Sequence, residues 1–194
     1  MKKLALIAIG IIFLFLLGCS SATYTPPDHT NEASEYQIIV NHPYDTVWKK
    51  LIQYAAKTFF VIDNYEKESG LIIFTFSSVN PEQFVTGGHW TYQGPEGNFS
   101  GDYVKFLRSF HNAILKGRIN IAVTDLGKNR TKIEVHVRYI LAVPMSQNIR
   151  ETIWAFDTGH CSTKTIGNRV SGTPATRTIC PTYAIEKSIL AALK

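Results

Sequence analysis

The 194-residue sequence contains few charged residues and few cysteines. Asp, Glu, Lys and Arg make up 18% of the chain, and there are 3 cysteines. Because 45% of the residues are apolar, the composition excludes an intrinsically disordered chain and predicts one sizeable core without a dense disulfide framework. Removing Lys2 and Lys3 lowers the formal net charge from +5 to +3, so charge does not point to a nucleic-acid partner.

Sequence motifs of common catalytic and metal sites are also missing. The chain has no phosphate-binding glycine loop, no Gly-x-Ser-x-Gly elbow and no His-Glu-x-x-His motif. Its six histidines are dispersed, and the two cysteines that lie 19 residues apart lack the paired spacing of zinc ligands. A metal site would have to be assembled by the fold. The sequence therefore predicts no enzyme, no metal site and no cofactor.

Two sets of residues could still be catalytic. Asp157, His160 and Cys161 have the side chains of a Cys–His–Asp set, but neighbours on an extended chain point to opposite sides, and a disulfide-bonded cysteine has no thiolate. The acids of the segment 66–68 and Asp102 could form a general acid/base pair. Acidic residues in turns are more often simply exposed to solvent than catalytic. Neither set is therefore favoured as a catalytic site.

The first 18 residues have the composition of an export signal. Lys2 and Lys3 precede an apolar run from Leu4 to Leu17, and the small residue Gly18 follows it. A membrane-spanning helix needs about 20 residues, and this run has 14. We therefore expect residues 1–18 to be a signal peptide.

The residues Leu16-Leu17-Gly18-Cys19 resemble the lipobox of bacterial lipoproteins. In that family the cysteine becomes the first mature residue and carries acyl chains such as palmitate, so the resemblance implies a membrane anchor on Cys19. Residue 20 is serine, not the aspartate that retains enterobacterial lipoproteins in the inner membrane. The resemblance thus implies an outer-membrane protein, and we expect its domain to face the periplasm.

The segment 19–34 is rich in Ser, Thr and Pro and shows no apolar period. This composition predicts a flexible, lipidated tether in which Tyr24 and His29 are solvated spacers. A single folded domain is expected over residues 35–194.

With Cys19 assigned to the lipid, Cys161 and Cys180 remain in a compartment that oxidises thiols. An even remainder predicts one disulfide. It would close a polar loop of about 20 residues and stabilise the fold by roughly 3 kcal/mol.

Hydrophobic periodicity in the domain predicts an α+β fold with an antiparallel sheet. Alternation of apolar and polar residues over 118–124 and 132–141 is typical of a two-faced hairpin. Helical spacing follows Pro43, and again follows Pro181. The predicted order is β-α-β-β-insertion-β-β-β-α, with two helices packed on one face of the sheet. The remaining strands are expected at 35–40, 59–63, 71–76 and 151–157.

The stretch from Val47 to Phe76 combines a helix, an acidic strand end, a Glu-x-x-x-Gly turn from Glu66 to Gly70, and an apolar strand. It resembles outer-membrane lipoproteins of the BamC kind, a subunit of the β-barrel assembly machinery. The resemblance covers about a sixth of the chain. It implies a fold more than a function.

The predicted insertion, residues 78–116, interleaves glycines with aromatic residues. Rigid aromatic rings on a flexible backbone are typical of a recognition surface, although the rings could also close one side of the sheet as core. Trp90, Tyr92, Phe99 and Tyr103 are the candidate partner-binding residues. Among these four, Trp90 and Tyr92 are expected to be the most exposed.

These patterns predict a non-enzymatic lipoprotein that binds an envelope protein partner. The contact would use the insertion or a basic, disulfide-closed loop containing Lys164, Arg169 and Arg177.

The alternative is a periplasmic carrier or sensor of a small apolar ligand or lipid. Its apolar helix-grip cavity would be lined by Leu51, Phe59, Phe74 and the aromatic residues of the insertion. A cavity of several hundred Å³ would favour the carrier, and a filled core with exposed aromatic residues would favour the binding module.

Overall fold

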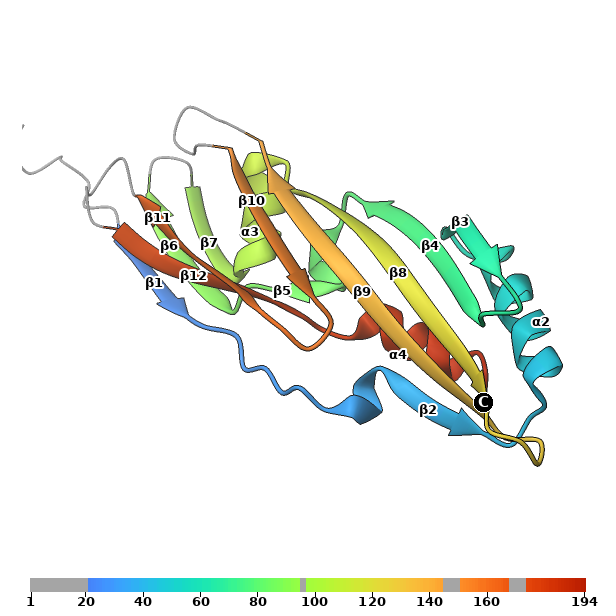
Figure 1. Ribbon diagram of the computed structural model, residues 1–194. Coiled ribbons are helices and arrows are strands. Elements are labelled where there is room, and N and C mark those ends of the chain that lie inside the picture. The colour runs from blue at the N-terminus through green and yellow to red at the C-terminus, as the bar shows by residue number, and fades with distance from the viewer. Residues whose placement is uncertain (1–20, 95–96, 145–150, 168–173) are drawn as a thin grey trace, which may run out of the picture.

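The computed structural model describes residues 21–94, 97–144, 151–167 and 174–194 (Figure 1). It confirms a mixed α+β fold with antiparallel sheets. The predicted signal peptide, Cys19 and Arg169 lie outside the described residues. No helix among the described residues has both the length and the apolar composition needed to cross a membrane.

The main sheet has the strand order β10-β9-β8-β4-β3, and β2 also pairs with β9. β2 pairs with the first part of β9, and β10 pairs with the second part, so both share one edge of this long strand. The strands of this sheet are β2 (Gln37–Val40), β3 (Val61–Glu66), β4 (Leu71–Ser78), β8 (Ile114–Asp125), β9 (Thr131–Val143) and β10 (Thr152–Asp157).

The hairpin of β8 and β9 is the centre of the main sheet. Its side chains alternate between buried and accessible along both strands, as the sequence predicts for a sheet with one face in the core. The turn includes Gly127, Lys128 and Asn129, all with positive φ. The buried residues of β9 are Thr131, Ile133, Val135, Val137, Tyr139, Leu141 and Val143.

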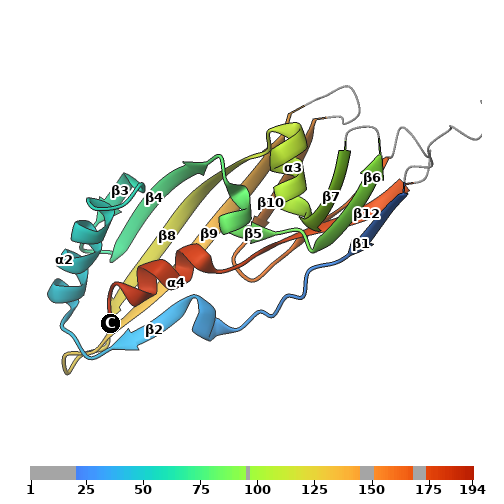
Figure 2. The same ribbon diagram turned by 180° about the vertical axis from the view of Figure 1, so that it is seen from behind.

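Two helices carry the apolar spacing seen in the sequence. α2 (Tyr44–Ala55) buries Val47 and Leu51, and α4 (Ala184–Ala191) buries Ile185 and Ile189. These side chains belong to the same core cluster as the buried residues of β8 and β9. Figure 2 shows α4 lying across β8 and β9.

The described residues of the predicted insertion form strands and a third helix, α3 (Tyr103–His111). The carboxylate of Asp102 caps this helix by accepting a hydrogen bond from the backbone N–H of Val104 at 2.7 Å. Asn112 ends the helix in the left-handed conformation. The other elements here are the 3-10 helix η2 (Pro81–Gln83) and the strands β5 (Val85–Thr86), β6 (His89–Gly94) and β7 (Gly97–Asp102).

The segment expected to be a flexible tether differs from that expectation. Residues Ser21–Thr25 form β1, which pairs antiparallel with β6 and completes the three-stranded sheet β1-β6-β7. A 3-10 helix, η1 (Ala33–Glu35), follows before β2. The absence of apolar periodicity is a poor guide here because β1 gains its order from backbone pairing with a strand far away in the sequence.

A third sheet has the order β11-β12-β5, where β11 spans Ser162–Gly167 and β12 spans Pro174–Pro181. Cys161 and Cys180 are joined by a disulfide, as the sequence predicts. Because Cys180 pairs with Thr86 of β5, this sheet connects the insertion to the C-terminal part of the chain. In Figure 1, β1 and β3 lie at opposite ends of an elongated molecule.

Candidate functional site

The aromatic residues of the insertion pack mainly on one another. Trp90 is 8% exposed and Tyr103 is 5% exposed, so the expectation that Trp90 is among the most exposed rings is wrong. Tyr92 and Phe99 are partly buried, and both contact the ring of Phe106 from α3. The physical reason is that α3 places its buried side against the β6–β7 hairpin. Trp90 and Tyr103 are therefore core residues and do not form an exposed recognition surface.

Arg177 of β12 lies among these rings. Its guanidinium carbon is 4.5 Å from the ring centres of Tyr24 and Trp90, and 5.6 Å from that of Tyr103. Burial raises the pKa of Tyr103 to about 12, while the nearby Arg177 opposes that rise. The predicted basic loop therefore uses Arg177 in internal cation–π contacts, whereas Lys164 on the paired strand is exposed.

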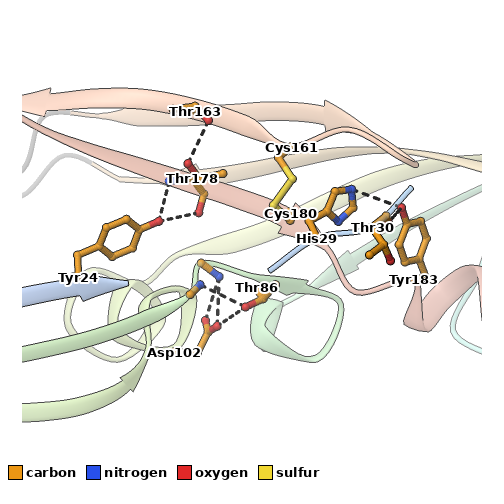
Figure 3. Close-up of a disulfide and its surroundings, with 12 residues drawn as sticks. Tyr24, His29, Thr30, Thr86, Asp102, Cys161, Thr163, Thr178, Cys180 and Tyr183 are labelled. Atoms are coloured by element: carbon orange, nitrogen blue, oxygen red, sulfur yellow. Dashed lines mark hydrogen bonds between the residues drawn. A yellow bond between two sulfur atoms is a disulfide. The ribbon is translucent and has the colours of Figure 1, made fainter. Parts of the chain in front are cut away.

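Tyr24 secures β1 to the domain. Its hydroxyl donates a hydrogen bond to the carbonyl of Thr178 at 3.2 Å and accepts one from the N–H of Thr178 at 2.9 Å (Figure 3). Further along the segment, His29 stacks on Tyr183, whose hydroxyl donates to the carbonyl of Thr30 at 2.8 Å. Neither Tyr24 nor His29 is a solvated spacer.

A fully buried carboxylate links α4 to the main sheet. Glu186 accepts hydrogen bonds from the hydroxyls of Tyr139 at 2.8 Å and Thr158 at 2.7 Å. Burial raises the pKa of Glu186, and the hydrogen bond from Thr158 partly offsets that rise. Burial also raises the pKa of Tyr139 well above its usual value. The cluster is enclosed, so its role is to join elements of the fold.

Replacing Glu186 with glutamine should change how stability depends on pH. The pKa of Glu186 in the folded protein is raised above its ordinary value of 4.5, so the folded state binds this proton more tightly than the unfolded state. That stabilisation is complete below pH 4.5 and is lost as the pH rises through the folded-state pKa. Urea unfolding at a series of pH values should therefore show wild type losing stability relative to Glu186→Gln as pH increases. A difference independent of pH would contradict this assignment.

The residues considered for catalysis have other roles. Cys161 is in the disulfide, and the backbone N–H of His160 donates to the carbonyl of Asp157 in a turn. Asp102 caps α3 and also accepts a hydrogen bond from Thr86 at 2.6 Å. The acids at 66–68 are exposed beside the β3–β4 turn.

An open cleft of about 530 Å³ lies at the β3–β4 turn. Its polar lining differs from the apolar helix-grip cavity expected for a carrier. Of the residues expected to line that cavity, Leu51 and Phe74 are fully buried in the core, and Phe59 is 54% exposed. The cleft is lined by Tyr44, Lys67, Glu68, Ser69, Gly70, Val123, Thr124 and Asp125.

Comparisons with known proteins give no relative. No family model, curated protein or solved structure matches this chain. The lipobox and the BamC-like resemblance stay predictions from the sequence.

Among the described residues, β3 carries more exposed large apolar side chains than any other strand. All six residues of β3 are exposed, and β3 is the terminal strand of the main sheet. Its register with β4 shifts between Ile62 and Asn64. We call the following four residues the β3 edge surface: Phe59 (54% exposed), Val61 (63%), Ile62 (37%) and Tyr65 (60%).

The sequence predicts a strand at residues 59–63, which overlaps only the first half of β3 and leaves Tyr65 in the turn, and it places the binding surface in the insertion. The run of β-branched and aromatic residues from 59 to 63 does not show whether a strand will be central or at an edge, because that depends on its neighbours in space. No local signal distinguishes the two.

Proposed function

We propose that this protein is a lipoprotein anchored in the outer membrane by acyl chains on Cys19, and that it is a non-enzymatic binding module for an envelope protein partner. The observation that carries the proposal is the β3 edge surface. A terminal strand offers unpaired backbone groups for β-strand addition, and exposed apolar side chains beside them supply the area that a partner buries.

The position of β1 supports this arrangement. β1 begins at Ser21, two residues after Cys19, and two residues span at most about 7 Å. Acyl chains on Cys19 would hold the β1 end of the domain next to the bilayer. Since β3 lies at the other end of the molecule, the β3 edge surface would face away from that membrane, where a periplasmic or envelope protein can reach it (Figure 1).

We also propose that α2 and α4 pack on one face of the main sheet. Both helices contribute side chains to the core that includes the buried face of β8 and β9. β3 buries none of its six residues in that core, so partner contact would cover side chains that the fold itself leaves in water.

Photo-crosslinking in intact cells tests the proposal. A photoreactive amino acid at Val61 or Tyr65 should give one discrete protein adduct, because both positions lie on β3. The matched control is Val79, which is 67% exposed but lies outside the β3 edge surface, and it should give no such adduct. Equal adducts from all three positions would refute the edge surface, and capture of lipid alone would favour the carrier.

The anchor has a separate readout in the same cells. In Cys19→Ser the protein should move from the membrane pellet to the soluble fraction, because the acyl chains can no longer be attached. Retention in the pellet would contradict the lipid anchor without affecting the crosslinking result.

A further inference from the structure

Three side chains with metal-binding atoms meet at the disulfide. Cys161 precedes β11, Cys180 lies in β12, and His29 comes from the segment between β1 and η1 (Figure 3). The two sulfur atoms and one ring nitrogen of His29 all lie within 4.8 Å of one another. The fold thus brings His29 next to two cysteines that are more than 130 residues away from it in the sequence.

The His29 ring is held in place by residues outside this cluster. It stacks on Tyr183 with 5.6 Å between ring centres and 14° between ring planes. Its Nε2 atom is 3.4 Å from the Tyr183 hydroxyl. Ring orientation fixed by a second group is a regular feature of metal-binding histidines. Tyr183 is therefore a positioning residue for His29.

The cluster has the size of a zinc site. With Zn–S bonds of about 2.3 Å and Zn–N bonds of about 2.1 Å, two donor atoms on one zinc ion lie at most about 4.6 Å apart. The ring nitrogen of His29 lies within 4.8 Å of both sulfur atoms, and the sulfurs, which are bonded to each other in the disulfide, can move apart once that bond is reduced. Cys180 is buried, whereas Cys161 and His29 are partly accessible, so an ion can reach the cluster from solvent.

We propose that reduction of the Cys161–Cys180 disulfide converts this cluster into a Zn²⁺ site with Cys161, Cys180 and His29 as ligands. A dithiol reductant supplies two electrons and two protons, the S–S bond breaks, and two protein thiols form while the reductant becomes a disulfide. Zn²⁺ then binds both sulfurs as thiolates, and two protons leave to solvent. Neutral His29 is the third ligand, and water can take the fourth position.

The oxidised protein lacks this site because a disulfide provides no thiolate. The cluster therefore makes zinc binding depend on redox state. In the reduced form the ion would also tie the segment around His29 to β11 and β12 through metal bonds. This role is independent of the β3 edge surface.

Cobalt titration of the full chain in detergent tests the proposal. A phosphine reduces the disulfide and is itself oxidised to the phosphine oxide, so no added thiol competes for metal. Co²⁺ should then produce a thiolate-to-cobalt charge-transfer band that Zn²⁺ abolishes, and the oxidised chain should produce none. Absence of the band from the reduced chain would overturn the site.

Two histidine variants distinguish the proposed site from nonspecific thiol binding. His29→Ala should weaken Co²⁺ binding by more than about 10-fold, because losing even an outer-shell partner of a metal-binding histidine costs about 10- to 100-fold in affinity. His160→Ala is the matched control, because His160 is next to Cys161 but is not in the cluster, and its affinity should equal that of wild type. Equal affinities of the two variants would remove His29 from the ligand set and overturn the proposal.

Circular dichroism keeps the test decisive if the reduced chain unfolds. Zn²⁺ should then restore the folded spectrum of wild type, since metal that binds the folded state stabilises it, and should fail to restore that of His29→Ala. Failure to restore wild type would also overturn the site.

Discussion

Replacing Gly70 with alanine is expected to lower the free energy of unfolding by about 3 kcal/mol. Gly70 closes the turn between β3 and β4 with a backbone φ of +69°. Residues that carry a Cβ atom adopt this left-handed conformation only at a cost in free energy. An added Cβ would also lie 2.1 Å from the carbonyl oxygen of Val123. The backbone there cannot move freely, because the N–H of Val123 donates to the carbonyl of Gly70 at 2.8 Å.

Gly127→Ala is the matched control for this prediction. Gly127 has nearly the same φ, +71°, but an added Cβ would have no atom within 4 Å. Only the conformational cost applies, about 1 kcal/mol. Urea unfolding followed by circular dichroism measures both variants. If the two alanines cost the same, the close contact between Gly70 and β8 does not limit the residue at this turn.

The main sheet could be predicted from sequence because its signal is local. Side chains on a strand alternate between two faces, so the alternation from Ile119 to Leu141 is sufficient to predict the β8–β9 hairpin and its buried side. The helix after Pro43 follows from the same kind of pattern with helical spacing. Each of these elements carries its own periodicity.

The insertion and the N-terminal segment could not be predicted in this way. β1 depends on β6, and Tyr24 depends on Thr178, which is 154 residues away. No local pattern contains such a pairing. Trp90 shows the same difficulty, since its burial results from contacts with Tyr24, Tyr103 and Phe106, which come from two other elements.

The candidate sites could likewise be predicted only where their signal is local in the sequence. The number of cysteines is sufficient to predict the bond between Cys161 and Cys180, because only two thiols remain after Cys19 is assigned to the lipid. The position of His29 beside them has no signal in spacing, and sequence reasoning therefore predicts no metal site. The exposure of Val61 and Tyr65 depends on what packs on the two faces of β3, and no local pattern contains that information.

Replacing Cys161 and Cys180 together with alanine is expected to lower the free energy of unfolding by about 3 kcal/mol. The bond closes a loop with a sequence separation of 19, and the unfolded chain gains entropy when this link is removed. Alanine is preferable to serine because Cys180 is 1% exposed, and a hydroxyl there would lack a guaranteed hydrogen-bond partner. Urea unfolding of the variant and of oxidised wild type measures the loss.

Reduction of wild type provides an independent check of that loss. In the absence of metal the phosphine-reduced protein should be destabilised to the same degree as the double variant, and the reductant should have no effect on the variant itself. A loss below about 1 kcal/mol would mean that β11 and β12 are held together without the covalent link. Their six backbone pairings would then maintain the sheet that joins β5 to the C-terminal helix. We expect the larger loss because β11 and β12 have few fully buried side chains of their own, so the disulfide contributes much of what holds them together.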